Sequence, residues 1–176
     1  RRIFWARPLS RAHAVVAQLS IPEGGAEGVL ISHGNRHGGY AVFVAEGHLT
    51  YVHNYLGLRE FTVRSDQPLP SGEYEVRMEF KPTGGPNFFE GRGSPAEVRL
   101  FVDGEQVGFG ELPYTVPNLF ATTGVSCGYA AFDTIDPSAY EPPFAFTGTI
   151  RALEVDLNGE AVTNPVAEIA ALLAEQ

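Results

Sequence analysis

The sequence predicts an all-β protein, an antiparallel β-sandwich followed by a short C-terminal helix. Three observations lead to this fold class. Most apolar residues recur at period two, the repeat of a half-buried strand. Turn residues separate the predicted strands at intervals of about 8–12 residues, which is typical of sandwiches and barrels. The 20 glycines and 13 prolines among 176 residues favour many short segments joined by turns over long helices.

The first predicted strands lie in the N-terminal half. Residues 13–20 (HAVVAQLS) are a β-branched run, and residues 28–33 (GVLISH) form the next one. A polar, glycine-rich stretch at 34–39 follows and is predicted to be a loop. Residues 40–45 and 48–53 flank Glu46-Gly47, which predicts a tight hairpin turn.

The second half continues the alternation. The strands predicted at 59–65 and 73–80 are separated by a proline and glycine turn, and those at 97–102 and 105–110 flank Asp103-Gly104. Asp-Gly between alternating runs is the strongest short-range hairpin signal in this sequence, and it predicts a positive φ at Gly104. The alternation over 147–157 slips by one near Ala152, which indicates a β-bulge.

Three segments depart from the strand pattern. Residues 81–95 are rich in proline and glycine and form a long predicted loop, and residues 112–144 are predicted to be largely irregular. Loops of this length are usually functional or pack on a neighbour. The C-terminal run 166–176 is helical in composition, with Asn164 as N-cap and Pro165 at the first helical position. We therefore expect a β-sandwich domain over 1–160 and a helical tail over 161–176.

Composition limits the classes of function. The 44% hydrophobic and 19% charged residues are a globular balance that argues against disorder. The charges of 12 Lys and Arg against 21 Asp and Glu sum to −9, which disfavours nucleic acid as a partner. No apolar run reaches the roughly 18 residues that cross a bilayer, and no signal-peptide pattern is visible, so we expect no membrane partner. The single cysteine, Cys127, excludes an internal disulfide and a multi-cysteine zinc site.

A series of short motifs appears in one fixed order along residues 13–157. The motifs are Gly24-Gly25-Ala26-Glu27-Gly28-Val29-Leu30, Arg36-x-Gly38-Gly39-Tyr40, Tyr51-x-x-Asn54-Tyr55-x-Gly57-Leu58, Ser65-Asp66-x-Pro68-Leu69-Pro70-x-Gly72, Val76-Arg77-Met78-Glu79-Phe80, Leu100-x-Val102-Asp103-Gly104 and Pro143-Phe144-x-Phe146-Thr147-Gly148-Thr149-Ile150. This series resembles the C-terminal domain of large bacterial arylsulfatases. The resemblance implies a concanavalin/laminin-G-like jelly roll. It also implies a catalytic sulfatase domain in the same polypeptide as partner.

The nucleophile of that family arises from a Cys/Ser-x-Pro-x-Arg motif, and this chain lacks one. Cys127 has neither the Pro nor the Arg, Ser20 lacks the Arg, and Ser32 lacks the Pro. We therefore expect no catalytic residue and no cofactor in this chain. The resemblance places calcium and formylglycine only in the missing catalytic domain. Together with the start at Arg1-Arg2, this leads us to expect a piece of a longer protein.

Six residues are the candidates for binding or interdomain contact: Asn35, Arg36, His37, Tyr55, Phe88 and Phe89. Arg36 offers a planar fork for a carboxylate or a sulfate, and the alternative is an ion pair inside the domain. Phe88-Phe89 are adjacent aromatics in a loop, which often bury against another domain. Tyr40, Tyr51 and Tyr55 could stack on a sugar, although core packing is the default for Tyr40 and Tyr51.

Two metal hypotheses are weaker. His33 and His37 have the spacing of ligands on a helix, but the glycines around them prevent a helix, and a polar loop is the alternative. Asp133, Asp136 and Glu141 could give oxygens to calcium, and a solvated loop is the alternative. We predict no metal site. Cys127 is expected to be a small buried apolar residue.

Two functions remain open. The main prediction is a non-catalytic accessory domain of an arylsulfatase-like hydrolase, which packs on the catalytic domain and shapes its substrate entrance. The alternative is an independent carbohydrate-binding module, with carbohydrate as the partner. Exposed aromatic residues on irregular loops favour the first function, and a row of them along one sheet face favours the second.

Overall fold

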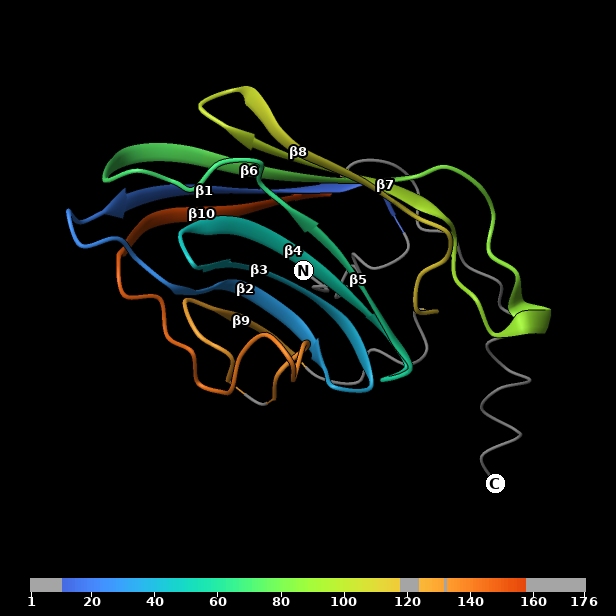
Figure 1. The fold of residues 1–176 in the computed structure, drawn as a ribbon. Coiled ribbons are helices and arrows are strands. Elements are labelled where there is room, and N and C mark those ends of the chain that lie inside the picture. The colour runs from blue at the N-terminus through green and yellow to red at the C-terminus, as the bar shows by residue number, and fades with distance from the viewer. Residues whose placement is uncertain (1–10, 118–123, 132, 158–176) are drawn as a thin grey trace, which may run out of the picture.

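A computed structural model describes residues 11–117, 124–131 and 133–157 of the chain. The described residues form two antiparallel five-stranded sheets packed face to face, with one short helical turn at the end of the sandwich (Figure 1). The predicted antiparallel β-sandwich is confirmed. The predicted helical tail at 161–176 lies outside the described residues. No helix within the described ranges is long and apolar enough to cross a membrane.

The strands of each sheet follow in a fixed spatial order. Sheet A is ordered β10 (Thr149–Leu157), β1 (His13–Ile21), β6 (Gly72–Pro82), β7 (Ala96–Val102) and β8 (Glu105–Leu112). Sheet B is ordered β5 (Arg59–Arg64), β4 (His48–Tyr55), β3 (Gly38–Ala45), β2 (Gly28–Asn35) and β9 (Val125–Cys127). Nine of these strands match the nine predicted runs. The three-residue β9 lies in the segment that the sequence predicts to be irregular.

The main core fills the space between the two sheets. Each strand contributes its alternate residues to it, as period two requires. On sheet B the largest buried side chains are Tyr40 and Tyr51, which stack with ring centroids 5.9 Å apart and are at most 1% exposed. On sheet A they include Met78 and Leu100, also at most 1% exposed. The expectation that Tyr40 and Tyr51 belong to the core is confirmed.

The hairpin turns follow their residue types. Asp103 and Gly104 have φ values of 47° and 81°, and positive φ at both central residues defines a type I′ turn. Glu46 and Gly47 repeat the pattern with φ values of 51° and 78°. The predicted bulge is also present, because the β1–β10 register shifts between Gln18 and Leu19, opposite Ala152.

The glycine-rich stretch at 34–39 differs from its prediction as a loop. Its ends belong to β2 and β3, and only Arg36 and His37 lie outside the strands. Gly34 and Gly39 face each other in the ladder, and a Cβ on either would lie 2.1 Å from a carbonyl oxygen of the other strand. The glycines are therefore required by the close approach of two strands and do not form an open loop.

A second, smaller core lies on the outer face of sheet B. We call residues 128–131 and 133–146 the cover segment, because this irregular stretch packs over the sheet near β2 and β9 (Figure 1). The buried apolar residues of this second core come from both partners: Val29, Ala41, Phe43 and Val52 of the sheet, and Ala130, Ile135 and Tyr140 of the cover segment. The cover segment explains why β2, β3 and most of β4 are buried on both faces.

Cys127 departs from its prediction. The sequence predicts a buried residue, but Cys127 is exposed. The reason is its place in β9, the edge strand of sheet B, which pairs only with β2 among the described strands. Partial burial raises the pKa of its thiol, so the thiolate form that reacts with electrophiles is disfavoured.

Candidate functional site

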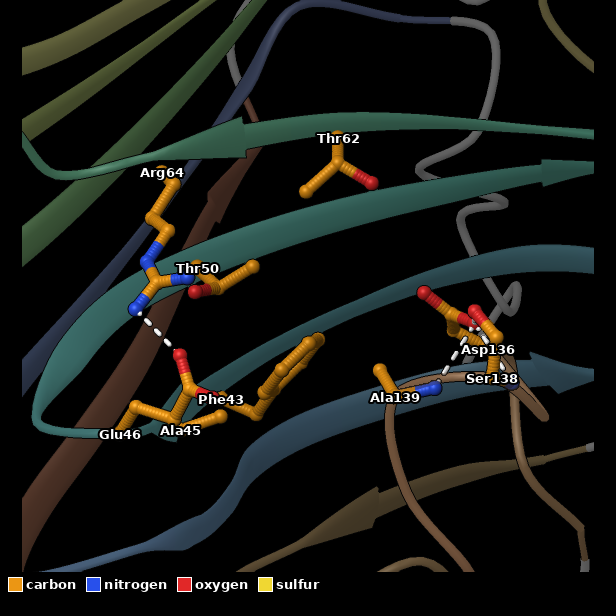
Figure 2. Close-up of a pocket in the computed structure, with 9 residues that line it drawn as sticks. All are labelled: Phe43, Ala45, Glu46, Thr50, Thr62, Arg64, Asp136, Ser138 and Ala139. Atoms are coloured by element: carbon orange, nitrogen blue, oxygen red, sulfur yellow. Dashed lines mark hydrogen bonds and ion pairs between the residues drawn. The ribbon is translucent and has the colours of Figure 1, made fainter.

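The candidate site is a hollow of about 340 Å³ on the outer face of sheet B. It lies between the cover segment and the exposed outer face of β5. We call it the β4–β5 hollow. Its lining residues are Phe43, Ala45, Glu46, Thr50, Thr62, Arg64, Asp136, Ser138 and Ala139. Figure 2 shows Glu46 and Arg64 on one side of the hollow and Asp136 with Ser138 on the opposite side.

Strand register sets one wall and the floor of the hollow. Phe43 of β3 lies opposite Thr50 of β4, which lies opposite Arg64 of β5. These three residues form a row across the sheet on its outer face. Thr62 lies two residues before Arg64 and points to the same face, because side chains alternate along a strand. Glu46 extends from the β3–β4 turn toward Arg64, and their ion pair measures 2.8 Å between Nη2 and Oε2.

The cover segment supplies the opposite wall. Oδ1 of Asp136 accepts hydrogen bonds from the Ser138 hydroxyl at 2.6 Å and from the backbone N–H groups of Ser138 and Ala139. These bonds hold a tight turn that presents Ser138 to the hollow. The second carboxylate oxygen of Asp136 accepts no hydrogen bond from the described residues and lies at the hollow side in Figure 2.

The floor and the polar groups define what the hollow can bind. Phe43 is 1% exposed, so its ring closes the floor without offering a stacking surface. The Thr62 hydroxyl makes no hydrogen bond within the described ranges. Arg64 gives one N–H to Glu46 and keeps others for a ligand. The hollow therefore offers hydroxyl, guanidinium and carboxylate groups in one place, the set that binds a ligand rich in hydroxyl groups.

The six residues predicted from the sequence lie elsewhere, and all of them lie at one end of the sandwich. Arg36 and His37 form the β2–β3 turn, and Asn35 is the last residue of β2 before it. This turn contacts the β4–β5 turn: a Cβ added to Gly57 would lie only 2.9 Å from the Arg36 carbonyl oxygen. Tyr55 precedes that second turn. Its hydroxyl donates to the carbonyl of Gly91 at 3.0 Å, directly after the helical turn η2 (Phe88–Glu90).

Arg36 forms the intradomain ion pair that the sequence left as an alternative. Its Nε and Nη2 donate to the two carboxylate oxygens of Asp133 at 2.8 and 2.9 Å. The pair raises the pKa of Arg36, and the hydrogen bond from Arg36 is the main cause that lowers the pKa of Asp133 to about 2. The Asn35 side chain accepts from the His37 N–H at 2.8 Å. The turn is therefore held by its own domain.

The aromatic candidates differ in exposure. Tyr55 is 9% exposed and packs edge-to-face on Tyr114, with ring centroids 4.8 Å apart, so its ring is not presented to a ligand. Phe88 is half-buried. Phe89 is fully exposed. A contact role for these residues stays a prediction.

The calcium hypothesis gains no support from the positions of its residues. Asp133 binds Arg36, and Asp136 binds its own turn. Within the described ranges, no group of three His, Cys, Asp or Glu side chains is placed to hold a metal ion.

One functional residue was missed by sequence reasoning. Asn54 is 0% exposed and connects three segments. Its amide nitrogen donates to the carbonyls of Ile135 at 2.7 Å and Arg36 at 3.1 Å, and its oxygen accepts from the Gly57 N–H at 2.7 Å. Asn54 thus fixes the cover segment to sheet B and sets the position of one wall of the hollow.

Comparisons with known proteins show the fold. No protein-family model and no curated protein sequence matches the chain, but many solved structures do. The leech intramolecular trans-sialidase complexed with 2,7-anhydro-Neu5Ac matches with a TM-score of 0.58 and 13% identity, over 94% of this chain and 24% of that one. The Ruminococcus gnavus IT-sialidase CBM40 bound to α2,3-sialyllactose matches with a TM-score of 0.53 and 12% identity, over 93% and 84%.

A third match comes from an animal matrix protein. Domains LG4–5 of the mouse laminin α1 chain match with a TM-score of 0.54 and 12% identity, over 89% of this chain and 39% of that one. The chain has a lectin-type β-sandwich fold. This result confirms the laminin-G-like architecture. At these identities the likeness concerns the fold alone, and it reaches no particular family.

The sequence pattern could predict the position of only some of the residues that line the hollow. Thr62 and Arg64 alternate with Phe61 and Val63 in a predicted strand, and this pattern places them on the outer face. The row Phe43–Thr50–Arg64 could not be predicted from the sequence, because it depends on the register between three strands. Asp136 and Ser138 lie in an irregular segment whose path no periodicity predicts.

Proposed function

We propose that this chain is a carbohydrate-binding module. The observation that carries the proposal is the β4–β5 hollow, which gathers a free hydroxyl, a guanidinium and a carboxylate at the edge of the covered part of sheet B. Such groups bind the hydroxyls of a sugar through hydrogen bonds to charged partners, which are stronger than neutral ones. Two of the solved structures of similar fold hold a sugar, α2,3-sialyllactose in one and 2,7-anhydro-Neu5Ac in the other, and this supports a sugar as the ligand class.

The hollow matches general features of small-ligand sites. It is concave, it combines an apolar floor with a few convergent polar groups, and it is already formed in the free domain. The fixed strand row Phe43–Thr50–Arg64 and the Asp136 turn hold the polar groups in place. Binding therefore needs little ordering of side chains, which reduces its entropic cost.

The test is a glycan array followed by titration calorimetry on the strongest hits. Thr62→Ala and Arg64→Gln should each weaken binding about tenfold or more, because each removes a hydrogen-bonding group from the hollow. Glu111→Gln is the matched control, since Glu111 is exposed and lies on the outer face of sheet A. The absence of binding to any glycan, or equal losses in the variants and the control, would contradict the proposal.

The second candidate is the accessory domain of an arylsulfatase-like hydrolase that packs on a catalytic domain. A specific observation favours it. Phe89 is fully exposed on η2, and Leu58 is 79% exposed on the neighbouring β4–β5 turn. Exposed apolar residues on adjacent turns at one end are typical of a surface that another domain covers. These exposed residues lie on turns, as the accessory function predicts, and do not line a sheet face.

Two experiments test the second candidate. The first is the gene sequence upstream of Arg1, where the candidate expects a Cys/Ser-x-Pro-x-Arg motif. The second compares Phe89→Ser with Phe109→Ser in the longest protein that this gene encodes. Phe89→Ser should lower kcat/KM for an aryl sulfate, and Phe109→Ser, a half-exposed control on β8, should not.

A further inference from the structure

We infer that the β4–β5 hollow selects uncharged glycans over acidic ones, and that Glu46 is the residue responsible. The inference rests on the proposed carbohydrate binding and adds the class of ligand. It separates this chain from the CBM40 sandwich of similar fold that is bound to sialyllactose, an acidic sugar.

The charge of the hollow is the first argument. Among its nine lining residues, Arg64 is the one cation, whereas Glu46 and Asp136 are two anions. The formal charge of the hollow is therefore −1. The whole chain carries −9, and a negative field of this kind repels an acidic ligand before contact. An acidic sugar would enter against both charges.

The pairing of Arg64 is the second argument. The guanidinium would be the natural partner for a ligand carboxylate, because its planar fork binds a carboxylate through two parallel hydrogen bonds. In this structure Glu46 already occupies one end of that fork at 2.8 Å. A ligand carboxylate must either displace Glu46 or sit beside it, and both cost free energy. A sugar hydroxyl needs only one hydrogen bond from a remaining Arg64 N–H group, and it brings no second negative charge next to Glu46.

The position of Glu46 is the third argument, because it makes the pairing a property of the fold. Glu46 lies at the first central position of the type I′ turn between β3 and β4, with a φ of 51°. Its N–H donates to the Glu27 carboxylate at 3.0 Å. The turn type and this anchor direct the Glu46 side chain toward Arg64, which extends from the neighbouring β5 (Figure 2). A non-glycine residue at positive φ is uncommon, so glycine or asparagine would suit the backbone better and would leave Arg64 unpaired.

The test compares the wild-type chain with Glu46→Gln on an array of neutral oligosaccharides, each printed with and without a terminal sialic acid or uronic acid. The wild type should bind neutral members at least tenfold more tightly than their acidic counterparts. Glu46→Gln removes the charge and frees Arg64, so it should shift the ratio toward the acidic members by about two- to fivefold, the range expected for a solvent-exposed ion pair. Glu46→Asn makes the same charge change with a residue that tolerates positive φ, and it replaces the first variant if Gln disturbs the turn.

The outcomes separate the inference from the proposed function. Glu111→Gln makes the same charge change on the other sheet, and it should leave the ratio of acidic to neutral binding unchanged. A wild-type chain that prefers acidic glycans would overturn the inference while the carbohydrate-binding function stands. Equal shifts for the Glu46 and Glu111 variants would also overturn it, because they would trace selectivity to net charge alone. No binding to any glycan would refute the proposed function itself.

Discussion

The buried histidine His53 makes the stability of this domain sensitive to mild acid. Its side chain is 0% exposed and lies on β4 between the two sheets. The Val116 N–H donates to its Nε2 at 2.9 Å, so Nδ1 carries the proton and donates to the Tyr51 hydroxyl at 3.2 Å. Burial, with a smaller contribution from nearby His13, lowers the pKa of His53 to about 3. Protonation would also place an N–H of His53 against the N–H of Val116.

The sign of the pH dependence follows from this shift. The unfolded chain takes up a proton at His53 near its ordinary pKa of 6.5, whereas the folded chain stays neutral down to about pH 3. Acid therefore stabilises the unfolded state. The contribution of His53 is fully present above pH 6.5 and is lost as pH falls toward 3, at about 1.4 kcal/mol per pH unit. Between pH 7 and pH 5 the expected loss is about 2 kcal/mol. His33, whose pKa burial also lowers, adds to it.

Urea unfolding at pH 7, 6 and 5 measures this effect. His53→Gln keeps an acceptor for Val116 but cannot titrate, so it should lower stability at pH 7 and remove about 2 kcal/mol of the loss between pH 7 and pH 5. His37→Gln removes an exposed histidine from the β2–β3 turn and should keep the wild-type pH dependence. If His53→Gln retains the full wild-type loss, the argument from burial and tautomer is wrong.

Three further predictions test the turn, the cover segment and the expected lack of hydrolysis. Gly104→Ala should lower the free energy of unfolding by about 1 kcal/mol, or Tm by about 2–4 °C, because Ala is strained at a φ of 81°. The loss would come from the backbone alone, since nothing lies within 4 Å of the added Cβ. An unchanged Tm would exclude the type I′ turn. Asn54→Ala should cost about 2–4 kcal/mol, since it leaves the buried carbonyl of Ile135 and the partly buried backbone groups of Arg36 and Gly57 without their partner. An unaffected unfolding midpoint would show that the cover segment needs no such anchor. The isolated chain should not hydrolyse an aryl sulfate, because it has no Cys/Ser-x-Pro-x-Arg motif; turnover above the buffer background would refute this.

Local rules account for the part of the fold that the sequence predicted. A strand with one buried face shows period two, and a type I′ turn demands residues that accept positive φ, so strands and hairpins such as Asp103-Gly104 were predictable. The bulge at Ala152 was visible for the same reason. The second core was not predictable, because the burial of Phe43 and Val52 on the outer face depends on a segment more than 75 residues away in the chain. Periodicity carries no record of such long-range packing.

The same limit explains why the candidate residues and the hollow differ. Arg36 was a candidate because it is a charged residue among glycines. The glycines, however, allow the close approach of β2 and β3, and Arg36 pairs with Asp133, 97 residues away in the chain. Arg64 carried no special signal, because a charged residue at an outward strand position is ordinary. Its importance arises from Thr50, which strand register places opposite it, and from Glu46, which reaches it from the β3–β4 turn.

The cover segment connects these observations. It buries the outer face of sheet B over β2, β3 and most of β4, whereas β5 beyond it stays exposed on that face. The hollow lies at the boundary between the part of this sheet face that the cover segment buries and the exposed part at β5. The wall that Asp136 and Ser138 form is part of the cover segment. Its position therefore depends on the contacts that hold this segment to sheet B, namely those of Asn54 and the Arg36–Asp133 ion pair. Arg36 therefore positions one wall of the hollow from a distance, and substitutions at this turn should weaken the proposed glycan binding by displacing the cover segment.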